Sequence, residues 1–171
     1  SNISLSDTID GGAGTDSVTG TIGGATAQGF ASISNVENAT FDFTAAGSFN
    51  AANTSMSVIN VTAGAGVAAT VNNIATGQRI DLEDTHLDGV TLDYATDATA
   101  TISLDATAGA QTTDALTVTD AQTVNISTAG GADTTLDAVT LDATETDFLT
   151  ITAGVAGSGL TMTGAAFGAD D

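Results

Sequence analysis

The side chains of this chain that could carry out chemistry are almost all carboxylates. Its 171 residues include 21 Asp and Glu, a single cationic side chain (Arg79), one His and no Cys, and the formal net charge is −20. Carboxylate and carbonyl oxygens are the ligands that Ca²⁺ takes, six to eight of them at about 2.3–2.6 Å. Glycine turns that expose carbonyl groups beside an aspartate would supply both kinds of oxygen. The composition therefore favours cation binding.

Residues 11–19 read Gly-Gly-Ala-Gly-Thr-Asp-Ser-Val-Thr and fit the pattern G-G-x-G-x-D-x-U-x at every fixed position. That pattern describes one turn of a calcium-binding parallel β-roll. The segment resembles the repeat-in-toxin (RTX) family, in which glycines turn the chain and aspartates hold calcium between turns. The resemblance implies Asp16 as a side-chain ligand and Gly12 and Gly14 in the carbonyl-bearing turn. Asp7 takes the equivalent place one repeat earlier, and Asp10 is a further candidate ligand.

Alternative interpretations exist for both acidic regions of the sequence. Residues 10–12, Asp-Gly-Gly, could be an ordinary turn with no metal. A second acidic group encloses Arg79 and His86, and it could bind calcium or form a solvated loop. Its candidate metal ligands are Asp81, Glu83, Asp84 and Asp88.

Aspartates also follow several of the expected strands. If they stack on neighbouring strands, they repel one another unless cations lie between them, which gives a second, diffuse route to calcium dependence. These residues are Asp93, Asp105, Asp120, Asp137 and Asp142.

Short segments with alternating apolar and polar residues recur along the chain. Each predicts a half-buried strand with two inward side chains, and turn-forming Gly, Asp, Asn and Thr separate them. The expected strands lie within residues 57–62, 90–94, 101–105, 115–119, 123–127, 138–142, 149–152 and 159–163.

The spacing of these segments predicts a solenoid. Leu116 leads to Val139 and then to Leu160, and Val124 leads to Leu149. The steps are roughly 20–25 residues, a ragged period that is typical of stacked coils. We therefore expect an all-β parallel β-helix or β-roll; the alternative is an antiparallel β-sandwich of the immunoglobulin type. Within one continuous domain, residues 1–24 would be RTX-like calcium-binding turns and residues 25–171 the β-solenoid region.

Residues 30–41, FASISNVENATF, contain a phrase of the form I-x-x-V-E-x-x-x-F/V. It resembles a phrase found in the β-solenoid repeats of Gram-negative surface-layer (S-layer) proteins and large exported adhesins. The resemblance covers residues 5–44 by motif and the remainder by composition only. Residues 45–57 are expected to form a loop or one short helical turn.

Composition argues against several classes of function. Lys and Arg contacts to phosphate dominate nucleic-acid affinity, so a chain with one Arg is not expected to bind nucleic acid or an anionic membrane surface. No apolar run approaches the roughly 20 residues of a membrane-spanning helix. Polysaccharide-cleaving β-helices use a carboxylate pair helped by Lys, Arg or His, and this chain has few such residues. We therefore expect that it is not an enzyme.

The family resemblance implies a secreted protein of the bacterial cell surface. We expect a structural, self-assembling component of a surface layer or extracellular lattice that Ca²⁺ stabilises. Its partners would be copies of itself, with cell-surface polysaccharide as a further candidate. The alternatives are a spacer or adhesive module of a large RTX adhesin and an extracellular polysaccharide-acting enzyme.

Overall fold

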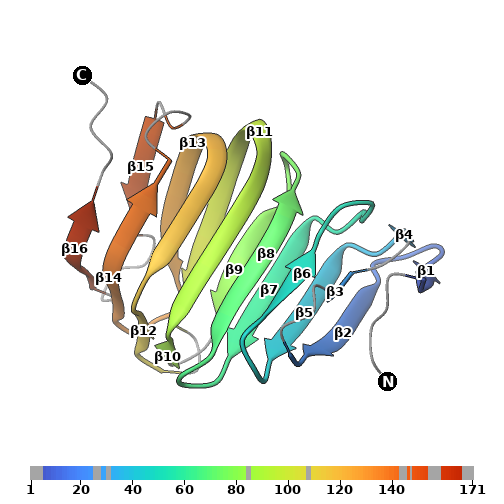
Figure 1. Cartoon of the computed structure of the whole chain (residues 1–171), viewed down its shortest axis with the longest axis horizontal. Helices are drawn as coiled ribbons and strands as arrows, with labels where there is room; N and C mark the ends of the chain where they lie inside the picture. The colour runs from blue at the N-terminus through green and yellow to red at the C-terminus, as the bar shows by residue number, and fades with distance from the viewer. Residues whose placement is uncertain are drawn as a thin grey trace.

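The computed structural model describes residues 6–24, 28–29, 32–83, 86–106, 109–142, 146, 148–153 and 159–166, without the side chains of His86 and residues 162–166. Its strands stack side by side into a β-solenoid of about six turns (Figure 1). Every pairing between strands of this part of the chain is parallel. The predicted parallel solenoid is confirmed, and the antiparallel sandwich is wrong.

The strands are short except where one runs across two sides of the solenoid. They are β1 (Thr8–Asp10), β2 (Ser17–Ile22), β3 (Gln28–Gly29), β4 (Ser32–Ser34), β5 (Asn38–Phe43), β6 (Gly47–Asn50), β7 (Val58–Ala63), β8 (Ala68–Ile74), β9 (Arg79–Glu83), β10 (His86–Leu87), β11 (Gly89–Asp105), β12 (Gln111–Thr113), β13 (Leu116–Ala129), β14 (Thr134–Leu141), β15 (Phe148–Thr152) and β16 (Leu160–Ala166).

One side of the solenoid, face A, consists of β2, β5, β7, β9, the second parts of β11 and β13, and β15. Alternate side chains point inward, so like residues stack about 4.8 Å apart on successive coils. The coils are shorter near the N-terminus, as from Ala39 to Ile59, than near the C-terminus, as from Ile126 to Ile151. The central inward ladder of face A is Val18, Ala39, Ile59, Ile80, Ile102, Ile126 and Ile151.

A second side, face B, consists of β3, β6, β8, the first parts of β11 and β13, and the second parts of β14 and β16. Its inward side chains meet those of face A in one continuous apolar core. Burying these side chains is the dominant favourable term in folding. The central inward ladder of face B is Phe49, Val71, Leu92, Val118 and Leu141.

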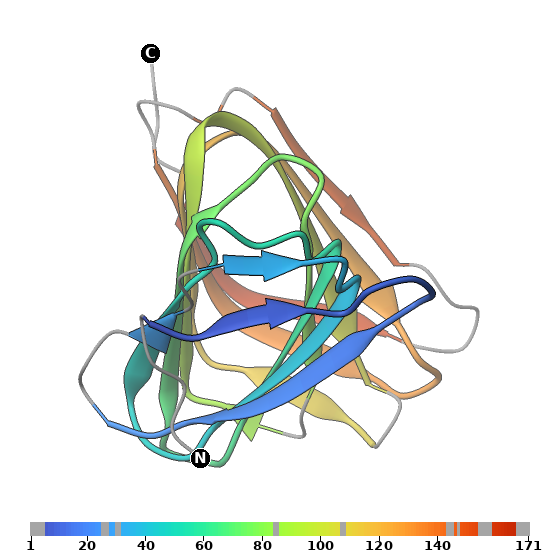
Figure 2. The same ribbon diagram turned by 90° about the vertical axis from the view of Figure 1, so that its right-hand side faces the viewer.

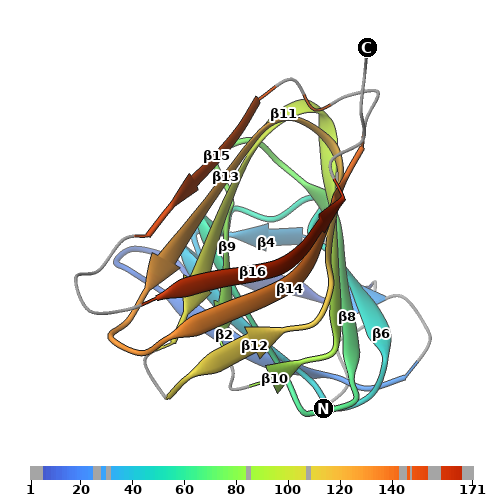
Figure 3. The ribbon, with the colours of Figure 1, turned by 90° about the vertical axis from the view of Figure 1, so that its left-hand side faces the viewer.

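The third side changes its place along the solenoid. In the N-terminal coils it follows face B and precedes face A, and it consists of β1, β4 and a bridge between Ile33 and Thr54. In the C-terminal coils it follows face A, and it consists of β10, β12 and the first parts of β14 and β16. The cross-section is three-sided at both ends (Figures 2 and 3).

Two local expectations are wrong. Val139 pairs with Ala165 rather than with Leu160, and Leu160 pairs with Thr134. The reason is that β14 covers both the third side and face B, so each side has its own ladder. The second correction is in residues 45–57, where β6 forms and buries Phe49 completely.

The described residues form no helix. Accordingly, this part of the chain has no helix that is long and apolar enough to span a membrane.

Candidate functional site

Residues 11–16 of the glycine-rich nonapeptide form the corner between β1 and β2 on the first coil, and residues 17–19 begin β2. On the next coil the same corner connects β4 to β5 with a shorter segment, residues 35–37. Asp10 Oδ1 accepts hydrogen bonds from Gly12 N at 3.0 Å and from Asn35 Nδ2 at 2.8 Å. The bond from Asn35, followed by that from Gly12, lowers the pKa of Asp10. Asp10 therefore shapes the turn and joins two coils.

Glycine is required at this corner for two different reasons. A Cβ on Gly11 would lie 2.0 Å from the carbonyl oxygen of Asn35, which is far inside contact distance. Gly12 and Gly14 have φ of 83° and 135°, values that side chains strongly disfavour. The nonapeptide glycines thus set a backbone path that other residues could not follow.

Asp16 is held at the end of this turn by the next coil. Its N–H donates to Glu37 Oε2 at 2.8 Å, and its carbonyl oxygen accepts from the N–H groups of Glu37 and Asn38, both at 3.2 Å. Its Oδ2 atom is buried and has no hydrogen-bond partner among the described residues. A buried carboxylate oxygen is costly unless a donor or a cation compensates it. The Asp16 carboxylate therefore fits the role of a cation ligand.

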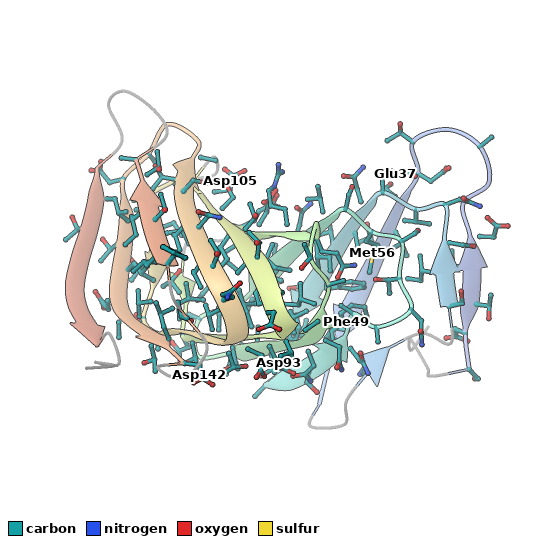
Figure 4. All side chains as sticks on the ribbon, turned by 90° about the horizontal axis from the view of Figure 1, so that it is seen from above. Glu37, Phe49, Met56, Asp93, Asp105 and Asp142 are labelled. Atoms are coloured by element: carbon teal, nitrogen blue, oxygen red, sulfur yellow. The ribbon has the colours of Figure 1, made fainter. Side chains whose placement is uncertain are left out.

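Glu37 was missed as a candidate residue. Ser17 pairs with Asn38, so Asp16 and Glu37 are neighbours on successive coils. Figure 4 places Glu37 beside the N-terminal corner. Asp16 and Glu37 are as far apart along the chain as Val18 and Ala39, which pair on the same two coils. That spacing was the signal that could have found Glu37.

Asp7 does not stack on Asp16. Because β1 pairs with β4 and β2 with β5, Asp7 and Asp16 lie on the same coil, before different strands. The nonapeptide phase between them therefore does not correspond to one turn of this solenoid. Gly12, Gly14 and Asp16 share one corner, and Asp7 lies outside it, on the other side of β1.

In the second acidic group, the chain's one arginine pairs with Asp81. Asp81 is only 6% exposed and accepts from Arg79 at 2.6 Å on each of its two oxygens. Glu83 stacks on Asp105 of the next coil, and burial, followed by the charges of Asp105 and Asp81, raises the pKa of Glu83. Asp88 is exposed on the short segment before β11. Asp84 lies outside the described residues.

A column of polar side chains follows the end of face B from coil to coil. In the N-terminal coils it is made of amides, and Asn73 Nδ2 donates to Asn50 Oδ1 at 3.1 Å. In the C-terminal coils carboxylates take these places, and Thr119 Oγ1 donates to Asp93 Oδ1 at 3.1 Å. Figure 4 shows Asp93 and Asp142 on one side of the rod and Asp105 on the other. The members of this corner column are Asn50, Asn73, Asp93, Asp120 and Asp142.

The carboxylates of the corner column repel one another at neutral pH. A hydrogen bond with Asp93, then desolvation, then the negative charges of Asp93 and Asp142 raise the pKa of Asp120. Within the described residues, however, no three Asp, Glu or His side chains converge as a ligand set for one metal ion. The carboxylates of the corner column therefore repel one another, and protonation or diffusely bound cations would reduce this repulsion.

This repulsion gives a pH prediction. Because the folded-state pKa of Asp120 lies above its ordinary value of 3.8, the folded state holds the proton more tightly than the unfolded chain. The free energy of unfolding should therefore rise as the pH falls from 7 through the raised pKa, and the gain should level off below 3.8. Asp120→Asn should reduce this rise; asparagine tolerates the φ of 61° at this position.

Urea unfolding at low salt over this pH range measures the effect, since salt would screen the charges. Asp88→Asn removes one exposed charge elsewhere and serves as the control. Equal pH slopes for Asp120→Asn and the unsubstituted protein would show that Asp120 does not contribute.

Comparison of the chain with models of known protein families, with curated proteins and with solved structures found no match. Function must therefore be inferred from the geometry of the chain's own residues.

Proposed function

We propose that the protein is a structural, self-assembling component of a bacterial surface layer or extracellular lattice, stabilised by Ca²⁺. The observation that carries the proposal is the corner of the first coil. There a glycine turn holds Asp16 with one carboxylate oxygen buried and unpaired, beside Glu37 of the next coil. Asp16 and Glu37 would be the side-chain ligands, and Gly12 and Gly14 lie in the turn that offers carbonyl oxygens.

The chain's own charge supports a calcium requirement. The one cationic side chain, Arg79, is already paired with Asp81. Hard divalent cations bind carboxylate and carbonyl oxygens, and a buried oxygen of Asp16 has no competing donor among the described residues. Calcium at this corner would join the first coil to the second, because Asp16 and Glu37 belong to different coils.

The fold supports a structural role. Continuous inward ladders make the solenoid a rod in which each coil contacts only its neighbours. Copies that carry a net charge of −20 repel one another until cations lie between their acidic surfaces. Calcium between rods, at outward carboxylates such as Asp93, Asp105 and Asp142, would turn repulsion into association. Secretion into calcium-rich medium and contact with cell-surface polysaccharide belong to the same proposal.

The experiment that tests this function is a calcium titration, with magnesium as the control cation. We expect millimolar calcium to convert the protein from small particles to large ones in sedimentation, and sheets or filaments to form in negative-stain electron microscopy. Magnesium should not replace calcium, because it demands a smaller octahedral site. A protein that stays monomeric at every calcium concentration would contradict the lattice and favour the spacer or adhesive module of a large adhesin.

A further inference from the structure

Three polar side chains point into the apolar core from the third side of the C-terminal coils. Gln111 is 1% exposed, and Thr113 and Thr134 are fully buried. Gln111 Oε1 and the Oγ1 atoms of both threonines have no hydrogen-bond partner among the described residues. Buried polar atoms in folded proteins almost always have a hydrogen-bond partner, so we expect a partner for each of these three atoms.

The three atoms lie on one inner surface. Gln111 of β12 pairs directly with Thr134 of β14, one coil away. Thr113 is two positions after Gln111 on the same strand, so its side chain points to the same side. Neighbouring strands are about 4.8 Å apart, but Gln111 Oε1 and Thr134 Oγ1 each lack a hydrogen-bond partner among the described residues, so no direct hydrogen bond joins these two atoms. One small molecule between them could reach both.

The orientation of the Gln111 amide is determined by its other contact. Gln111 Nε2 donates to the carbonyl oxygen of Leu82, at 2.8 Å, where β9 approaches its end. The reversed amide would place two acceptor oxygens against each other. Gln111 Oε1 is therefore the amide atom that is left without a partner in the described part of the chain, and it can only accept a hydrogen bond.

We propose that ordered water is bound between Gln111, Thr113 and Thr134 inside the solenoid. A water molecule can accept from a threonine hydroxyl and donate to Gln111 Oε1, and buried waters make about three such bonds. A metal cation fits less well, because the three oxygens are neutral and Ca²⁺ takes six to eight oxygens. The bound water would link β12 to β14 in the coils where the third side follows face A.

Thr134→Val distinguishes a hydrated site from a dry one, because the two predict opposite signs. Valine has nearly the same shape as threonine but no hydroxyl. If water bridges the site, the substitution removes one of its partners, and the unfolding equilibrium constant should rise by about fivefold to tenfold. If the site is dry, it removes an unpaired buried hydroxyl, and the constant should fall. A fall would overturn the proposal.

Thr140→Val is the matched control, because Thr140 is an exposed residue of the same strand. Its unfolding equilibrium constant should change by no more than about twofold. A high-resolution crystal structure of the unsubstituted protein supplies the second measurement. Water should appear at about 2.7–3.2 Å from Gln111 Oε1 and Thr134 Oγ1. A site without density, or an ion at about 2.3–2.6 Å, would overturn the proposal even if Thr134→Val fails to fold.

Discussion

Replacement of Phe41 by alanine is expected to lower the free energy of unfolding by about 3–5 kcal/mol, the range for large aromatic side chains removed from a core. Phe41 is fully buried on face A, and its ring lies 4.1 Å from the ring of Phe49, centroid to centroid. The residue that pairs with Phe41 on the preceding coil is Gly20, which has no side chain to fill the cavity. Urea unfolding followed by circular dichroism measures the loss.

Phe148→Ala is the matched control for Phe41→Ala. Phe148 is 66% exposed near the other end of the solenoid, so its removal should change the free energy of unfolding by less than about 0.5 kcal/mol. Equal losses for the two substitutions would show that Phe41 and Phe49 are not packed in a common core.

The second large effect is expected from calcium. If the corner of the first coil binds Ca²⁺ only when folded, the free energy of unfolding should rise by about 2.7 kcal/mol when free calcium is 100 times the dissociation constant. Asp16→Asn should abolish this increment, because asparagine keeps the shape of the Asp16 side chain but not the charge of its carboxylate, whose Oδ2 atom is buried. Chemical unfolding with and without chelator, for both proteins, measures the difference.

Asp42→Asn controls for the loss of one negative charge. Asp42 lies on β5, where its Oδ1 accepts from Thr62 Oγ1 at 3.3 Å, and an asparagine oxygen can still accept that bond. This variant should retain the full calcium increment. An increment that survives in Asp16→Asn would place the stabilising ions elsewhere, for example along the corner column. No increment at any millimolar concentration would refute calcium binding by the folded chain.

Local pattern was sufficient for much of the fold because a strand repeats its side-chain direction at every second position. The alternation around Val124 and around Leu149 predicted that both point inward on successive coils, and these residues pair on face A. The same reasoning failed for Leu160, since alternation says which residues point inward but not which side of the coil they belong to. The strand over residues 47–50 was missed because Phe49 is its one large apolar residue.

At the candidate site, sequence reasoning located the glycine turn and Asp16 but not their surroundings. The pattern G-G-x-G-x-D depends on local backbone geometry, and the φ values of Gly12 and Gly14 agree with it. Glu37 reaches Asp16 only because the coil between them returns to the same corner. The pairing of Arg79 with Asp81 is also local, because the two residues are neighbours on one strand. The burial of Asp81, in contrast, depends on the packing of the surrounding coils.

The sequence by itself determined the fold class of the protein, through short alternating strands at a recurring period. It also determined the acidic composition and the glycine turn that ends in Asp16. These features follow from interactions between near neighbours in the chain and from composition. Only the tertiary structure decided which carboxylates are neighbours, where the third side lies, and which polar atoms remain unpaired in the core. The physical reason is that coil length is not constant: the coil from Ala39 to Ile59 is shorter than the coil from Ile126 to Ile151. Each contact between coils therefore depends on the conformation of every intervening corner.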